Sequence, residues 1–192
     1  MLRIKKDRRD AMAAIDLILL GMIKKQPQSA YELQKNVEYR NISKWIKVST
    51  PAIYKKVLQL EEKGYLRGES VKEGRMPEKT IYRITDMGDK YFRSLMEKTA
   101  GQATRVFLDF NAVIMHLDLV SAEEGKALLG RIEEEIVAYR DFLAHMQTER
   151  QHIPLRGRTI LEQQLSVAQV LTDWVEKFEK ECEETNEEER KQ

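Results

Sequence analysis

The chain has 192 residues and a formal net charge of +1, and its length leaves room for a core in one long domain or two small ones. The charge is unevenly divided. Residues 1–100 hold 22 basic and 13 acidic side chains, a net charge of +9, and residues 101–192 hold 11 and 19, a net charge of −8. The basic half suits a polyanionic partner, whereas the acidic half is expected to do something else.

Two features exclude a membrane protein and a disulfide scaffold. The apolar run between Asp16 and Lys24 is too short to span a membrane, and no signal-peptide cleavage site follows it. Cys182 has no second cysteine to pair with, so a reducing compartment is expected. We therefore expect a cytoplasmic protein. The glutamates around Cys182 predict a raised thiol pKa, which argues against a redox sensor.

The chain opens with a series of helical patterns. A first helix is predicted over residues 10–25, and the following Pro27 ends it. Ser29-x-x-Glu32 is a capping-box motif and predicts a second helix through Val37. An irregular polar loop is predicted over residues 38–48.

A third helix is predicted after that loop. Thr50 is expected to be its N-cap and Pro51 its first residue, because proline lacks the N–H that this position leaves unused. Gly64 supplies a left-handed C-terminal stop. The residues expected to face inward follow helical spacing: Ile53, Val57 and Leu60.

The pattern then changes to a period of two. Residues 66–71 and 80–84 read as strands joined by a long basic hairpin, and Thr85 is expected to cap a fourth helix. No clear breaker separates that helix from residues 99–119. Helix, turn, basic helix and two short strands follow one another in the order of a winged helix-turn-helix, which inserts one helix into the DNA major groove.

The second half predicts three further helices. Their apolar stripes cover residues 106–117, 128–146 and 161–182, and the tail 183–192 is expected to fray. The predicted fold class is mainly α: a winged helix-turn-helix domain with a two-stranded wing (residues 1–98), followed by an α-helical dimerisation domain (residues 99–192).

The candidate DNA-binding residues lie on the third helix, before it and on the wing. Hydroxyl and ammonium groups suit phosphate oxygens, and Gln59 could pair with adenine. Tyr54 is left open between core packing and a phosphate hydrogen bond. The candidates are Lys44, Ser49, Thr50, Tyr54, Lys55, Lys56, Gln59, Arg75 and Lys79.

Taken together, these motifs resemble the PadR-like transcriptional regulators. The resemblance covers about residues 12–95 and rests on Ser29-Ala-Tyr31-Glu-Leu, on Ser49-Thr-Pro-Ala-Ile-Tyr54, on the helix Ile53–Gly64 with Val57 in place of leucine, and on Tyr82-x-Ile-Thr-x-x-Gly88. The resemblance implies that Tyr31 joins the DNA-binding candidates. It also implies a homodimer, often a repressor, that binds operator DNA and whose C-terminal helices dimerise and bind small aromatic or drug-like effectors.

The alternatives to this interpretation concern the C-terminal aromatic residues, the class of binding partner and catalysis. The aromatic residues Phe107, Phe110, Trp174 and Phe178 are candidates for an effector pocket, although plain core or dimer interface is preferred at this spacing. A winged-helix adaptor that binds proteins rather than DNA is the alternative function; four cations on the groove-facing side favour double-stranded DNA. No catalytic motif, glycine-rich phosphate loop or metal-ligand spacing is present, so we expect no enzyme, cofactor or metal.

Overall fold

The computed structural model describes residues 2–46, 50–72, 78–102 and 106–189. The chain divides into two compact units, Met1–Thr104 and Arg105–Gln192, called here the N-terminal and C-terminal units. The boundary expected after residue 98 falls within helix α4, which ends at Ala100. Within the described ranges, no helix is long and apolar enough to cross a membrane.

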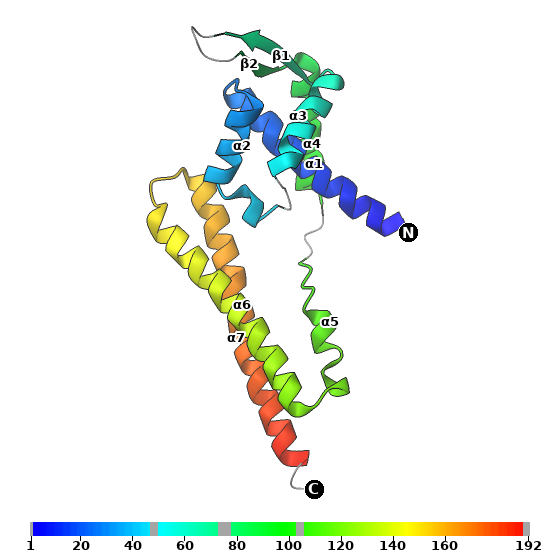
Figure 1. Ribbon diagram of the computed structural model, residues 1–192, viewed down its shortest axis with the longest axis vertical. Coiled ribbons are helices and arrows are strands. Elements are labelled where there is room, and N and C mark those ends of the chain that lie inside the picture. Colours follow the sequence, from blue (N-terminus) through cyan, green and yellow to red (C-terminus); the bar gives the residue numbers. More distant parts are fainter. Residues whose placement is uncertain (1, 47–49, 73–77, 103–105, 190–192) are drawn as a thin grey trace. The chain divides into compact units, whose positions relative to one another are not determined.

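The N-terminal unit is a winged helix-turn-helix (Figure 1), and the mainly helical fold class with a two-stranded wing is confirmed. Helix α1 begins at Leu2 rather than at Asp10, and α2 runs two residues past the predicted end at Val37. The elements are α1 (Leu2–Lys25), α2 (Ala30–Tyr39), the 3-10 helix η1 (Ile42–Lys44), α3 (Thr50–Glu62), β1 (Leu66–Val71), β2 (Lys79–Ile84) and α4 (Asp86–Ala100).

The predicted helix ends can be checked against hydrogen bonds. The capping box at α2 is confirmed, because Glu32 N–H donates to Ser29 Oγ at 3.2 Å and Ser29 N–H donates to Glu32 Oε2 at 2.7 Å. Helix α3 includes Thr50, so the prediction that this residue is the N-cap is wrong by one position. Gly64 has φ +73°, the left-handed conformation expected after the helix.

The core of the N-terminal unit lies where α1, α2, α3 and the strands meet. The three α3 residues predicted to face inward, Ile53, Val57 and Leu60, are all buried, so that prediction is confirmed. They pack in one cluster with buried residues of the other elements, which include Leu19, Leu20, Ile23, Leu33, Leu66, Tyr82 and Leu95. Burial of these side chains fixes the orientation of α3 about its own axis.

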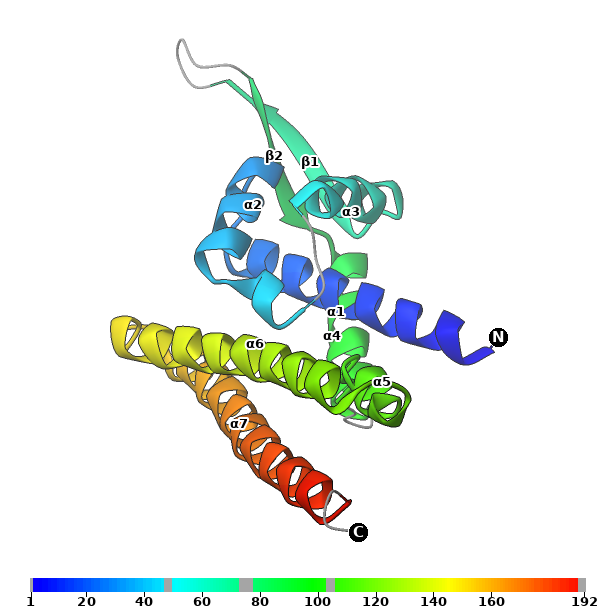
Figure 2. The same cartoon turned by 60° about the horizontal axis from the view of Figure 1, so that its bottom comes forward.

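The two strands pair antiparallel, with Leu66 opposite Ile84. They lie beside α2 and α3 (Figure 2), and the chain before α2 adds one more bridge, in which Tyr82 N–H donates to the Gln28 carbonyl at 3.0 Å. The buried Gln28 side chain accepts from Asn36 Nδ2 at 2.8 Å and donates to the Met22 carbonyl at 3.1 Å. One glutamine therefore ties the α1–α2 turn to α2 and the wing.

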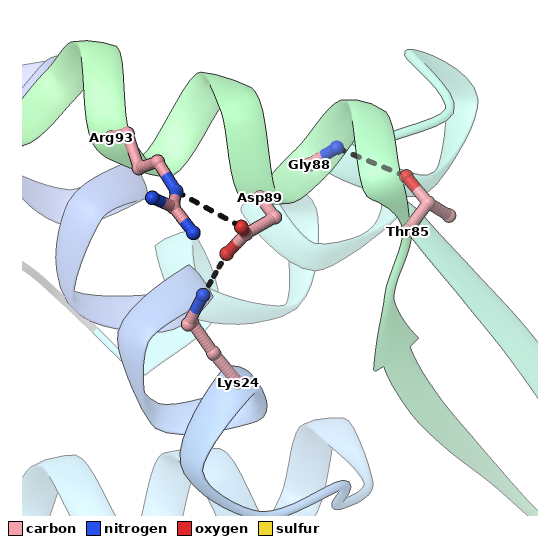
Figure 3. A network of polar contacts seen from close by, with 5 residues as sticks. All are labelled: Lys24, Thr85, Gly88, Asp89 and Arg93. Atoms are coloured by element: carbon pink, nitrogen blue, oxygen red, sulfur yellow. Dashed lines mark hydrogen bonds and ion pairs between the residues drawn. The ribbon is translucent and has the colours of Figure 1, made fainter.

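The start of α4 is hydrogen-bonded to the end of α3. Thr85 Oγ1 accepts from Gly88 N–H at 3.0 Å (Figure 3), which confirms Thr85 as the N-cap. The same hydroxyl donates to the Gly64 carbonyl at 2.7 Å. One turn on, Asp89 accepts hydrogen bonds from Lys24 of α1 and, at 3.1 Å, from Arg93. These contacts join α1, α3 and α4 around the junction.

The C-terminal unit is dominated by two long helices that pack side by side. Lys126 near the start of α6 pairs with Glu183 near the end of α7 at 2.6 Å, so the two helices are antiparallel. Leu129, Ile136 and Leu143 of α6 and Ala168 and Val175 of α7 are buried between them. The elements are α5 (Asn111–Ile114), the 3-10 helix η2 (Leu117–Leu119), α6 (Ala122–Glu149) and α7 (Leu155–Glu189).

Two predictions for this unit are wrong. The apolar stripe over residues 106–117 forms only the four-residue α5 and a turn of η2, because Val106, Phe107 and Met115 remain exposed and a short helix needs packing to persist. The last helix was expected to end near Cys182, with residues 183–192 frayed, but α7 continues to Glu189. The pair between Lys126 and Glu183 gives the acidic end of α7 a basic partner on α6.

Candidate nucleic-acid interface

The solvent-facing side of α3 is the candidate surface for DNA. Tyr54 is 45% exposed and is not among the buried core residues, and Lys55 is also exposed. Gln59 is half-buried. Ser49 lies outside the described residues, and of Thr50 only the backbone is described.

Lys56 does not lie on this surface, and the expectation that it faces outward is corrected. Its side chain is 9% exposed, and its Nζ lies 2.7 Å from Asp16 Oδ1 on α1. A buried cation needs a partner of opposite charge, and Asp16, itself buried, provides one. The cations on the solvent-facing side of α3 are therefore fewer than the sequence indicated.

The environment of Asp16 extends to α4. Tyr91 donates its hydroxyl to Asp16 Oδ2 at 3.3 Å, and its ring stacks on Tyr65 with centroids 4.2 Å apart. Burial, and then the negative charge of Asp16, raise the pKa of Tyr91 to about 12. Asp16 thus receives contacts from both α3 and α4.

The base of the wing is fastened to the helices by carboxylates. Gly68 N–H of β1 donates to Glu61 Oε1 of α3 at 2.9 Å. Glu32 of α2 lies 3.7 Å from Lys79 Nζ of β2, and the Ser29 backbone N–H, with Lys79 contributing less, lowers the pKa of Glu32. Arg75 of the predicted wing set lies outside the described residues.

On the wing itself, Glu69 holds two arginines. It accepts a hydrogen bond from Arg67 on the same strand and lies 3.5 Å from Arg83 on the opposite strand. Arg67 first, and Arg83 with it, lower the pKa of Glu69. Arg67 and Arg83 were not among the candidates predicted from the sequence. They lie opposite each other in the sheet register, and this pairing is the signal that could have found them.

Two further candidates are exposed. Tyr31 near the start of α2 is 58% exposed, and Lys35 Nζ lies 5.6 Å from its ring centroid. Lys44 is exposed at the end of η1. One exposed apolar residue of α3, Leu58, was not among the candidates although it is 56% exposed.

Three of the four aromatic effector candidates stack on one another, and the fourth, Phe107, is exposed. Phe110 stacks on Trp174 at 5.6 Å between centroids, and Trp174 stacks on Phe178 at 5.8 Å, whereas Phe107 is 72% exposed. An open, mainly apolar cleft of about 400 Å³ is lined by Phe110 and by residues of α6 and α7, which include Leu128, Arg131, Ile132, Tyr139 and Leu171.

A metal site and a reactive cysteine find little support in the part of the chain that the structure describes. Those residues hold no group of three or more His, Cys, Asp or Glu side chains arranged for a metal ion. The raised thiol pKa predicted for Cys182 is confirmed in direction; burial is the first cause, and Glu181 and Glu179 add to it.

Residues 19–94 match the family described as the transcriptional regulator PadR-like family, which is a family of regulators and not of enzymes. The resemblance stated from the motifs is therefore confirmed. No curated protein matches the chain.

Solved structures share the fold over most of the chain. Bacillus subtilis PadR in complex with operator DNA has a TM-score of 0.75 at 17% identity and covers 88% of this chain and 99% of its own; the same protein with p-coumaric acid also scores 0.75, at 14% identity, over 88% and 98%. The PadR-like regulator BC1756 from Bacillus cereus scores 0.66 at 21% identity, over 87% and 94%. The Vibrio cholerae virulence activator AphA scores 0.68 at 20% identity, over 89% and 99%. At these identities the comparisons establish the fold.

Proposed function

Because residues 19–94 match the PadR-like family of transcriptional regulators, we propose that the protein is a homodimeric repressor that binds operator DNA. The observation that carries the proposal is the face of α3. Its apolar side is buried, and its other side presents Tyr54 and Lys55 to solvent beside a two-stranded wing. A helix held in this way can enter a major groove without unfolding its own core.

Charge supports the same proposal. Residues 1–100 carry a net charge of +9, as counted above, so the unit that holds α3 attracts a polyanion. A structural neighbour, Bacillus subtilis PadR, has been solved with operator DNA. Repression is proposed from the family resemblance, and transcription in vitro from an operator-bearing template, with and without the protein, tests its direction.

The test of DNA binding is selection from random duplexes followed by affinity measurements over a series of salt concentrations. A homodimer should select a palindrome whose half-sites are about 34–36 Å apart, one turn of DNA. Lys55→Met should reduce the log–log salt slope by about 1.8, because a homodimer loses one phosphate contact in each half-site at about 0.9 per contact. The double variant Asp16→Leu/Lys56→Met is the control, because it removes the buried ammonium without leaving a buried charge unpaired, and the slope should stay unchanged.

The outcomes separate the alternatives. If the wild-type protein shows no salt-sensitive binding to any duplex, the DNA proposal is wrong and a protein-binding adaptor becomes the better hypothesis. If the selected site has no two-fold symmetry, the homodimer part is wrong while DNA binding stands.

Dimerisation is proposed through the C-terminal unit. Val167 and Val170 on α7 are 42% and 66% exposed, and the cleft beside α6 is lined almost entirely by apolar surface. A second copy that covers these side chains would remove apolar area from water. A small aromatic effector is proposed for the same unit, on the basis of the stacked Phe110, Trp174 and Phe178 and of the neighbour solved with p-coumaric acid.

A further inference from the structure

An apolar strip runs along the solvent-facing side of α3. Pro51, Tyr54 and Leu58 are separated by three and four residues, so they lie on one helical stripe. All three are exposed, and Leu58 is the most exposed leucine of the N-terminal unit among the described side chains. The buried residues of the helix, Ile53, Lys56, Val57 and Leu60, lie on the opposite side.

One exposed leucine on a protein surface needs no explanation, so its position must carry the argument. Leu58 lies one turn after Tyr54 and three residues after Lys55, at the middle of the face that points away from the core. The candidate DNA-binding residues all carry hydrogen-bonding groups, but the side chain at the centre of this face, Leu58, has none. A helix that read bases only by hydrogen bonds would carry a polar side chain there.

The major groove offers one apolar group for such a side chain. The C5 methyl of thymine projects into the groove, and aliphatic side chains recognise it by contact. The flanking Lys55 and the net charge of +9 in this half of the chain fit a polyanion better than an apolar protein partner. The same surface therefore combines a cation for phosphate with an apolar side chain for a base.

We propose that Leu58, supported by Tyr54, reads a thymine methyl group, so that each half-site of the operator carries thymine at one fixed position. The inference rests on the proposed DNA-binding function and deepens it by naming a base and the residue that recognises it. It assigns sequence selectivity to contact with one methyl group rather than to a hydrogen bond.

The experiment removes that methyl group from the DNA and its partner from the protein. The operator recovered by selection with the wild-type protein is synthesised with deoxyuridine in place of thymidine, one symmetric pair of positions at a time. At one position, wild-type affinity should fall about fourfold per half-site, the value for one methyl withdrawn from an apolar contact. Leu58→Ala should bind the thymidine operator more weakly and lose nothing further on the deoxyuridine operator.

Two controls separate contact from folding. Leu58→Met keeps an apolar side chain and should keep the deoxyuridine penalty, and Met96→Ala removes a side chain of similar exposure, 51%, from α4 and should leave every affinity unchanged. Equal penalties in the wild type and in Leu58→Ala, or no penalty at any thymidine, would overturn the inference while DNA binding stood. Absence of salt-sensitive binding to any duplex would overturn the proposed function and this inference with it.

Discussion

Asp16 and Lys56 form an ion pair of 2.7 Å, and their side chains are only 5% and 9% exposed. The pair joins α1 to the helix that carries the candidate DNA-binding face. A buried ion pair stabilises little in total, because both charges lose their hydration, but removal of one partner leaves the other charge buried and uncompensated. A variant that lacks one of the two charges is therefore expected to lose more stability than one that lacks both.

This pair leads to a prediction about stability. Lys56→Met should lower the free energy of unfolding of the N-terminal unit by about 3 kcal/mol or more, because among the described contacts Asp16 then keeps the Tyr91 hydroxyl but no cation. The double variant Asp16→Leu/Lys56→Met should recover most of the loss, since no buried charge remains. Urea unfolding at fixed protein concentration, followed by Trp45 fluorescence in a Trp174→Phe background, measures both. A double variant as unstable as the single one would contradict the explanation.

A second prediction concerns Gly88 at the start of α4. A Cβ at this position would lie 2.0 Å from the Tyr65 carbonyl oxygen, a distance that no side-chain rearrangement can relieve. Gly88→Ala should therefore cost about 4 kcal/mol or more, among the largest effects of a single substitution. Gly130→Ala is the matched control, because nothing lies within 4 Å of its Cβ position and alanine favours a helix interior. A Gly88→Ala variant with wild-type thermal stability would show that the junction can open at little cost.

Features that depend on neighbouring residues could be predicted from the sequence, whereas features that depend on contacts between distant residues could not. The strands, the caps at Ser29 and Thr85, and the inward face of α3 follow from local patterns, and they were predicted within a residue or two. The burial of Lys56 could not be predicted in this way, because its partner Asp16 lies forty positions earlier and the pairing exists only after α1 and α3 pack. Leu58 was missed because only hydrogen-bonding groups were considered as DNA contacts.

A third prediction follows from the raised pKa of Tyr91. Its pKa of about 12 in the folded protein exceeds the ordinary tyrosine value of 10, so the unfolded chain loses this proton first as the pH rises. Between these values the folded state holds more protons, and the free energy of unfolding must fall with rising pH. Tyr91→Phe should make that decline shallower. Urea unfolding of both proteins between about pH 9 and pH 12, which covers the titration range of tyrosine, gives the slope of the unfolding free energy against pH. Equal slopes in the two proteins would exclude Tyr91 as the cause of the decline.

A fourth prediction tests the proposed dimer. Val170 is 66% exposed in the single chain, so Val170→Lys should not disturb the fold of one subunit. If a second copy covers this side chain, the ammonium group would be buried without a partner, and the dimer should dissociate. Light scattering at micromolar concentration gives the mass, and circular dichroism checks that the helices remain. Thr159→Lys places the same charge on an exposed polar position of α7 as a control. A wild-type monomer would refute the dimer outright.

The last prediction concerns a ligand in the C-terminal unit. The sequence showed no clear breaker between the fourth helix and residues 99–119, but α4 ends at Ala100. The aromatic stack offers a different contact, because Phe110 precedes α5 whereas Trp174 belongs to α7. A planar phenolic acid that stacks on Trp174, with its carboxylate near Arg131 in the adjacent cleft, should change the spacing of these two segments.

Whether this ligand regulates DNA binding is a question of linkage. A ligand shifts the protein between two states only by its different affinity for them, so a tenfold loss of operator affinity requires about 1.4 kcal/mol of coupling. Operator DNA must then weaken ligand binding tenfold in return. A library of phenolic acids and planar cations would be screened by melting temperature and by operator affinity. Fluorescence would report binding in Trp45→Phe, where Trp174 remains, and much less in Trp174→Phe. Ligands that stabilise the fold but leave operator affinity unchanged would contradict the coupling, because binding without differential affinity shifts no equilibrium.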